Sequence, residues 1–109
     1  MNLPKEYVAF MILAIIVLGL YLYSQVVTDK VIFFYHPSCG HCKTFKPMWE
    51  EIKKQISIQA KEINCEDYPD KCTSYKIEGY PTIILEKNGE RKEFNDKRTI
   101  ENVVNFIES

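Results

Sequence analysis

Apolar and polar positions divide the chain into one long apolar segment and a series of short mixed blocks. Residues 8–27 read VAFMILAIIVLGLYLYSQVV and include no charged side chain. A helix rises about 1.5 Å per residue, so this run is long enough to span the roughly 30 Å hydrocarbon core of a bilayer. Tyrosines, which favour the membrane interface, stand near both of its ends: Tyr7, Tyr21 and Tyr23. We therefore predict an uncleaved transmembrane helix with short flanks over residues 1–29.

A cleaved signal peptide is the alternative for this segment. Signal peptides have a shorter apolar region, which is followed by small residues at the cleavage site. The only candidate site, Leu22-Tyr23-Ser24, has a bulky residue where a small one is needed. An anchor is therefore the better interpretation. Its orientation is not set by the flanking charges, because they cancel on each side: Lys5 with Glu6, and Asp29 with Lys30.

Residues 30–109 carry the periodicities of a small α/β domain. Continuous or alternating apolar runs predict strands, and apolar positions three or four residues apart predict helices. Asn88-Gly89 is a strong signal for a two-residue hairpin between the last two strands. The predicted order is β-α-β-α-β-β-α, with a four-stranded mixed sheet flanked by helices. The elements are strands Val31–Tyr35, Ile58–Ile63, Thr82–Leu85 and Arg91–Phe94, and helices Gly40–Ile56, Glu66–Tyr75 and Arg98–Ile107.

Composition narrows the environment and the partners. The chain has 14 basic and 15 acidic residues, with a net charge of −1, and no basic stripe that would indicate a nucleic-acid partner. All 4 cysteines lie in the predicted domain. An even number of cysteines in a small domain behind a membrane segment suits an oxidising compartment. We expect a single-pass membrane protein whose domain faces the endoplasmic reticulum lumen, a periplasm, or the exterior of a cell or virion.

Two of these cysteines stand where a buried strand gives way to a helix, in the motif Cys39-Gly40-His41-Cys42. Unpaired N–H groups and the helix dipole favour negative charge at this point, so we expect a lowered pKa for Cys39. Cys39 is then the nucleophile, and Cys42, one turn into the helix, resolves the mixed disulfide. Gly40 allows a partner chain to approach, and positive charge on His41 makes the disulfide more oxidising.

Two other interpretations of this motif remain. It could be half of a zinc site that Cys65 and Cys72, or His41, complete, or it could be a purely structural disulfide. Structural zinc pairs usually lie on knuckle turns rather than between a buried strand and an amphipathic helix. Redox chemistry is therefore the preferred hypothesis, and we expect no metal.

The segment VIFFYHPSCGHCKTFKPMW, residues 31–49, resembles the catalytic segment of the protein disulfide isomerase family. Gly79-Tyr80-Pro81-Thr82 resembles that family's second signature, and the similarity extends to Ile107. The resemblance implies a minimal thioredoxin-like fold behind the transmembrane helix. It also implies a thiol–disulfide oxidoreductase of the oxidase or isomerase type, which needs no cofactor. Its partners would be thiols and disulfides of client polypeptides, or one membrane redox protein.

The resemblance also implies individual roles. Pro81 matches the family's cis-proline, which packs against the dithiol, and the backbone of Tyr80 would pair with a bound substrate strand. Arg98 matches an arginine that swings toward the resolving cysteine, although a solvated arginine at a helix start is the alternative. Cys65 and Cys72 resemble a structural disulfide of some relatives. The alternatives for this pair are a second exchanging disulfide or two free thiols.

The sequence departs from the family's pattern at three places. Phe33 stands where the isomerases keep a buried glutamate that accepts the resolving thiol's proton, and we expect slower turnover unless Glu62, rather than Lys61, points inward and replaces it. Ser38 stands in place of a tryptophan, and His36 nearby is interpreted as solvated. The fold's usual first strand and helix are missing, and the membrane helix takes their place in the chain.

A function of a different class is also considered. The domain could be a non-catalytic interaction module that kept the fold and tethers a client protein at the membrane. That role needs no dithiol, so the intact Cys39 and Cys42 pair favours the enzyme.

Overall fold

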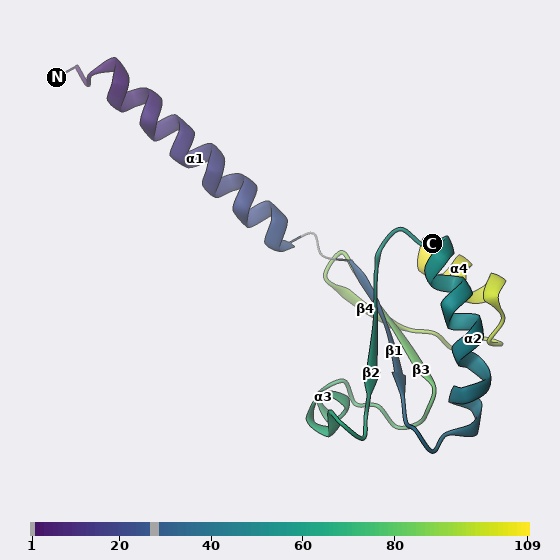
Figure 1. Ribbon diagram of the computed structural model, residues 1–109. Helices are drawn as coiled ribbons and strands as arrows, with labels where there is room; N and C mark the ends of the chain where they lie inside the picture. Colours follow the sequence, from purple (N-terminus) through teal and green to yellow (C-terminus); the bar gives the residue numbers. More distant parts are fainter. Residues whose placement is uncertain (1, 27–28) are drawn as a thin grey trace.

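The computed structural model describes residues 2–26 and 29–109 (Figure 1). Val27, the last residue of the predicted apolar run, lies outside the described residues, as do Met1 and Thr28. The described elements are α1 (Lys5–Val26), β1 (Lys30–Tyr35), α2 (Gly40–Gln55), β2 (Gln59–Asn64), α3 (Pro69–Ser74), β3 (Thr82–Lys87), β4 (Glu90–Glu93) and α4 (Ile100–Glu108).

The N-terminal helix α1 exposes apolar side chains along its length. The segment Lys5–Ser24 has a mean hydropathy of 2.2, and none of its most apolar 18-residue stretch is buried. A helix on the surface of a soluble domain usually buries an apolar stripe against that domain. Length and composition thus allow α1 to cross a membrane, and a signal sequence has the same properties.

The remaining elements build a mixed four-stranded sheet with the strand order β2-β1-β3-β4. Strand β1 pairs in parallel with β2, where Phe33 lies opposite Glu62, and antiparallel with β3, where Phe33 lies opposite Ile83. Strands β3 and β4 form the predicted hairpin, and Asn88 and Gly89 both have positive φ, 56° and 76°, as a two-residue turn of this kind requires. The predicted fold class is confirmed.

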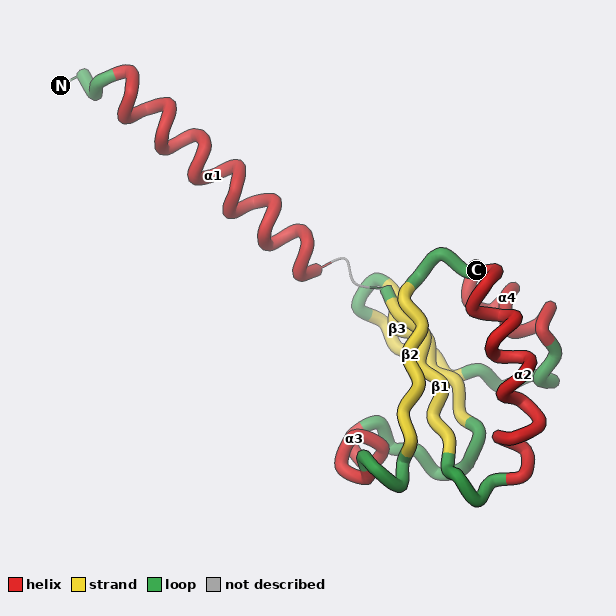
Figure 2. Tube along the Cα trace, viewed as in Figure 1, coloured by secondary structure: helices red, strands yellow, loops and turns green. Residues whose placement is uncertain are grey.

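The helices are divided unequally between the two faces of the sheet (Figure 2). Helices α2 and α4 pack on one face, where they bury Phe33, Phe45, Trp49 and Ile107. The short α3 lies on the opposite face, over a smaller apolar cluster that contains Ile32, Phe34, Cys65, Cys72 and Ile84. Side chains alternate along a strand, so the continuous apolar run of β1 supplies both clusters at once.

Two element boundaries differ from the prediction in a way that affects the site. Helix α4 begins at Ile100 rather than Arg98, because the hydroxyl of Thr99 accepts a hydrogen bond from the Asn102 N–H and caps the helix. Arg98 therefore lies in the segment before the helix. Helix α3 begins at Pro69 rather than Glu66, and a proline is well suited to a first helical position.

Candidate active site

The predicted dithiol lies at the junction of β1 and α2. The chain leaves β1 at Tyr35, and Cys39 is the N-cap residue of α2. The Cys39 Sγ accepts a hydrogen bond of 3.2 Å from the backbone N–H of Cys42, so the sulfur stands where a capping oxygen usually stands. A negative charge on this sulfur is stabilised by that N–H group and by the positive end of the helix dipole.

The two sulfurs have different environments, although they are three residues apart. Cys39 is half-buried, whereas Cys42 is buried against the apolar cluster on the α2 face. Burial, together with the hydrogen bond and charge of the neighbouring Cys39, raises the pKa of the Cys42 thiol to about 11. A backbone hydrogen bond from His36 and the positive charge of Arg98 act in the opposite direction. Both cysteines are free thiols in this structure.

A second loop, distant in sequence, lies against the dithiol. The Tyr80–Pro81 peptide bond is cis, and the Cys39 thiol donates a hydrogen bond of 3.6 Å to the carbonyl oxygen of Tyr80. The hydroxyl of Thr82 donates to the Gly79 carbonyl at 2.7 Å and fixes the turn before the strand. The two motifs singled out in the sequence are thus joined directly, at the ends of β1 and β3.

The exposed flank of the site is polar and open. Gly40 and His41 are exposed, and a Cβ added at Gly40 would have no atom within 4 Å. Arg98, in the segment before α4, is also exposed, and its positive charge acts to lower the pKa of Cys42. A partner chain therefore meets open space above Gly40, and the role of this residue in partner approach stays a prediction.

One feature near the dithiol was not expected from the sequence. His36, predicted to be solvated, is half-buried, and its Nδ1 accepts a hydrogen bond of 3.2 Å from the Ser38 N–H. The Ser38 Oγ lies 2.7 Å from the same nitrogen, and the His36 ring centre is 5.7 Å from that of Tyr80. The only sequence signal was a histidine three residues before Cys39, which by itself predicts no contact.

The position of the family's buried acid is apolar, as the sequence indicated. Phe33 is 1% exposed and packs against Phe45 and Trp49. Glu62 points to the same face as Phe33, but it lies at the sheet edge, with its side chain 34% exposed and its carboxylate 3.8 Å from the Lys53 Nζ. Glu62 is also not among the groups that shift the pKa of Cys42. This placement gives no support to Glu62 as the replacement base.

The other two cysteines are joined to each other. Cys65 and Cys72 form a disulfide with a Cα–Cα distance of 5.8 Å, as the resemblance implied. Bonded sulfurs cannot act as zinc ligands, so Cys65 and Cys72 do not complete a zinc site with Cys39 and Cys42, and His41 alone remains of the further ligands proposed for it.

Comparisons with known proteins agree with this geometry. The thioredoxin family model matches residues 22–109. A probable protein disulfide-isomerase A6 of Medicago sativa is 35% identical over 92 residues, which cover 77% of this chain and 25% of that protein. The J-Trx1 fragment of ERdj5 aligns with a TM-score of 0.69 and 27% identity, over 72% of this chain and 41% of the fragment. A reduced thioredoxin pre-protein of Schistosoma mansoni aligns with a TM-score of 0.68 and 25% identity, over 84% of this chain and 87% of that one.

The family match extends over more than half of the chain and includes both the dithiol and the cis-proline loop. The match covers most of this chain but only about a quarter of the length of the Medicago sativa protein. The residues that the family model matches include the whole four-stranded sheet. The chain therefore belongs to the thioredoxin family.

Proposed function

We propose that this protein is a thiol–disulfide oxidoreductase of the oxidase or isomerase type, which exchanges disulfides with protein thiols through Cys39 and Cys42. One observation carries the proposal: the Cys39 Sγ caps α2 at 3.2 Å from the Cys42 N–H, and it lies 3.6 Å from the Tyr80 carbonyl oxygen. A half-buried sulfur at the positive end of a helix, beside a second thiol, suits nucleophilic attack on a disulfide.

The exchange proceeds through a mixed disulfide. The Cys39 thiolate attacks one sulfur of a client disulfide, and the other client sulfur leaves as a thiolate and takes up a proton. The Cys42 thiol then loses its proton and attacks Cys39, which closes the Cys39–Cys42 disulfide and releases the second client thiolate. Two electrons pass from the enzyme dithiol to the client. The same steps in reverse oxidise a client dithiol.

The cis-proline loop supplies the binding surface for the client. In the reduced enzyme the Cys39 thiol donates a hydrogen bond to the Tyr80 carbonyl oxygen, so this acceptor is already in use. Once Cys39 has lost its proton or has formed a mixed disulfide, that hydrogen bond is gone, and the carbonyl can accept one from the backbone of the client. The open space above Gly40 lets the client backbone come this close. We assign Pro81, whose peptide bond with Tyr80 is cis, to the same binding surface.

The resolving step requires a proton to leave the buried Cys42 thiol, whose pKa is about 11. Phe33 offers no proton acceptor in the core below it, and Glu62 pairs with Lys53 at the sheet edge. We therefore assign Arg98 the role of a positioning residue, which lowers the pKa of Cys42 through its charge as it approaches. Water takes up the proton.

We propose that α1 anchors the protein in a membrane and that the domain lies in an oxidising compartment on one side of that membrane. The apolar surface of α1 and the disulfide between Cys65 and Cys72 support this assignment. Carbonate extraction of membranes checks the anchor: the full chain should stay in the membrane fraction with an intact N-terminus. A mature protein that begins after residue 24 would show a signal peptide instead.

Insulin reduction by the full chain in non-ionic detergent micelles, with dithiothreitol as the electron source, tests the activity. The native protein should accelerate the reaction, whereas Cys39→Ser should be at the rate without enzyme. Equal rates for the two proteins would favour the non-catalytic tethering module. A Cys42→Ala variant should trap clients as mixed disulfides through Cys39, and mass spectrometry then identifies those clients.

A further inference from the structure

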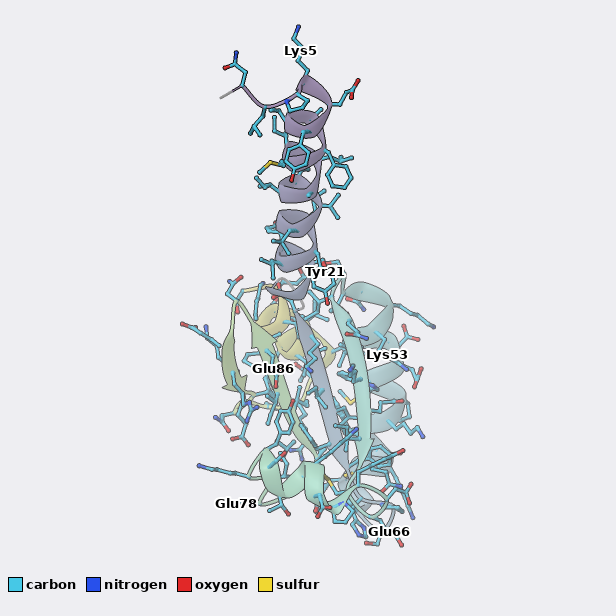
Figure 3. The ribbon with its side chains drawn as sticks, turned by 90° about the vertical axis from the view of Figure 1, so that its left-hand side faces the viewer. Lys5, Tyr21, Lys53, Glu66, Glu78 and Glu86 are labelled. Carbon is cyan, nitrogen blue, oxygen red and sulfur yellow. A yellow bond between two sulfur atoms is a disulfide. The ribbon has the colours of Figure 1, made fainter. Side chains whose placement is uncertain are left out.

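The face of the sheet opposite the dithiol helix is incompletely covered. Figure 3 looks onto this face, where α3 crosses one end and, among the described helices, none lies over the rest. A cleft with a volume of about 420 Å³ opens there. Its floor and walls come from β1, β2, α3 and the residues on either side of α3, and the charged residues among them are Lys30, Lys61, Lys71 and Glu62.

Lysines outnumber the single carboxylate around the apolar floor of the cleft, and that carboxylate, Glu62, lies 3.8 Å from the Lys53 Nζ. Lys61 lies beside Ile32 in the sheet register, and Ile63 lies beside Phe34, so alternating side chains of β2 face the cleft. Lys61 and Lys71 form no ion pair with any residue that the structure describes. The Lys71 Nζ stands 4.9 Å above the Tyr68 ring, which holds its charge at the rim. Two cations are thus available to an anionic group that enters the cleft.

The cleft also adjoins an open strand edge. Strand β2 is the outermost strand on this side of the sheet, and within the described residues its only strand partner is β1. An outermost strand presents N–H and C=O groups that another extended chain can pair with. A lysine on such a strand discourages pairing with like-charged chains and permits pairing with acidic ones.

We propose that the cleft and the free edge of β2 together bind an extended acidic segment of a partner protein, which adds a strand to the sheet and places carboxylates at Lys61 and Lys71. The charge of the cleft and the free backbone edge both select this occupant. A second copy of the chain suits the site less well, because the self-complementary pairing centred on Lys61 would set two lysines opposite each other. An anionic lipid headgroup would use the lysines but not the strand edge.

The test uses the full chain in non-ionic detergent micelles and a fluorescent seven-residue peptide of alternating threonine and glutamate. This peptide should bind, and its affinity should fall as salt is added. A peptide of alternating threonine and lysine, and a glutamate peptide interrupted by proline, should not bind. The first control tests the charge, and the second tests strand pairing, because proline lacks the N–H donor.

Charge reversal identifies the site. Lys61→Glu combined with Lys71→Glu should weaken binding of the glutamate peptide by about tenfold or more, since two surface pairs are lost. Lys92→Glu, which reverses an exposed lysine on the opposite edge strand β4, should leave binding unchanged. The double variant Lys61→Gln with Lys71→Gln should weaken binding of the glutamate peptide less. Because it introduces no new charge, this variant is the control for misfolding of the charge-reversed protein. Cys39→Ser should bind like the native protein, so this result does not depend on the proposed redox activity.

Three outcomes overturn the proposal. These are no binding of the glutamate peptide, equal binding of the proline-interrupted peptide, and binding that the reversal at Lys61 and Lys71 leaves unchanged. A lipid site would be revealed in nanodiscs: phosphatidylserine, but not phosphatidylcholine, would then protect Lys61 and Lys71 from acetylation while the peptide fails to bind.

Discussion

The two faces of the sheet each hold one pair of cysteines, and the pairs have opposite character. On the α2 face Cys39 and Cys42 are free thiols, and Cys39 is accessible at a helix N-terminus. On the α3 face Cys65 and Cys72 are bonded, and they are 6% and 5% exposed within an apolar cluster. Each pair follows a strand of the parallel β1–β2 unit and includes a residue of the next helix.

The difference shows that placement, rather than residue type, separates the free thiols from the bonded pair in this domain. Cys39 serves as the cap of α2, so its sulfur meets a backbone N–H and faces solvent. In contrast, α3 begins at Pro69, and Cys72 lies inside this short helix with its sulfur turned to the core. A disulfide sulfur that no thiolate can reach does not undergo thiol–disulfide exchange.

The largest expected difference is in alkylation of the reduced, native protein. At pH 8 a thiol with the pKa of about 11 assigned to Cys42 is about one part in a thousand thiolate, and burial slows it further. Iodoacetamide should therefore label Cys39 first, Cys42 far more slowly, and Cys65 and Cys72 not at all, as peptide mass spectrometry can measure. Comparable labelling rates of Cys39 and Cys42 would contradict the different environments of these two thiols.

Removal of the α3-face disulfide should reduce stability but not activity. Replacing Cys65 and Cys72 together with alanine frees a loop whose ends are 7 residues apart, at a cost of about 2–3 kcal/mol of unfolding free energy. Fluorescence of Trp49, the single tryptophan, reports unfolding in urea. Insulin reduction below the transition should match the native rate. A loss of activity in the folded variant would make this pair part of the redox chemistry.

Arg98 and Arg91 offer a matched pair of cations on the two faces. Arg98→Gln should raise the pKa of Cys42 further and slow the resolution of a mixed disulfide by a few-fold at pH 7, with the difference shrinking as the pH approaches about 11. Arg91→Gln removes a cation that stacks on Tyr75, on the other face, and should leave this rate unchanged. Single-turnover kinetics from pH 6 to 10 measure both. An equal effect of the two changes would exclude a positioning role for Arg98.

The smallest expected effect concerns the ion pairs of the α3 face. Burial alone would raise the pKa of Glu86, but hydrogen bonding by Tyr75 and the charges of Lys30 and Arg91 outweigh it and lower the pKa. A lowered folded-state pKa stabilises the fold above the unfolded value, near 4.3, and this contribution is lost as the pH falls through the folded value. Glu86→Gln should therefore destabilise the protein at pH 7 and much less at pH 3, in urea titrations. If Glu86→Gln lowered the unfolding free energy equally at pH 7 and pH 3, the lowered pKa of Glu86 would not contribute to stability.

Local patterns were enough to determine most of the fold. The apolar run of β1, the amphipathic spacing of α2 and the Asn88-Gly89 turn each depend on neighbours in the chain, so they could be predicted without knowledge of the rest. The strand-to-helix junction likewise placed Cys39 at an N-cap. Boundaries were less certain: α4 begins after Arg98 because the Thr99 hydroxyl caps it, and competing caps in that segment look alike in sequence.

What required the tertiary structure were the contacts between segments far apart in the chain. These include the 3.6 Å approach of Cys39 to Tyr80, the His36 ring centre 5.7 Å from that of Tyr80, and the placement of Glu62 at the sheet edge rather than beneath Cys42. The basic cleft on the α3 face belongs to the same class, because it forms between β1, β2 and α3. The reason is physical: periodicity along a chain reports which side of an element is buried, whereas the neighbour that a side chain meets is set by how the elements pack.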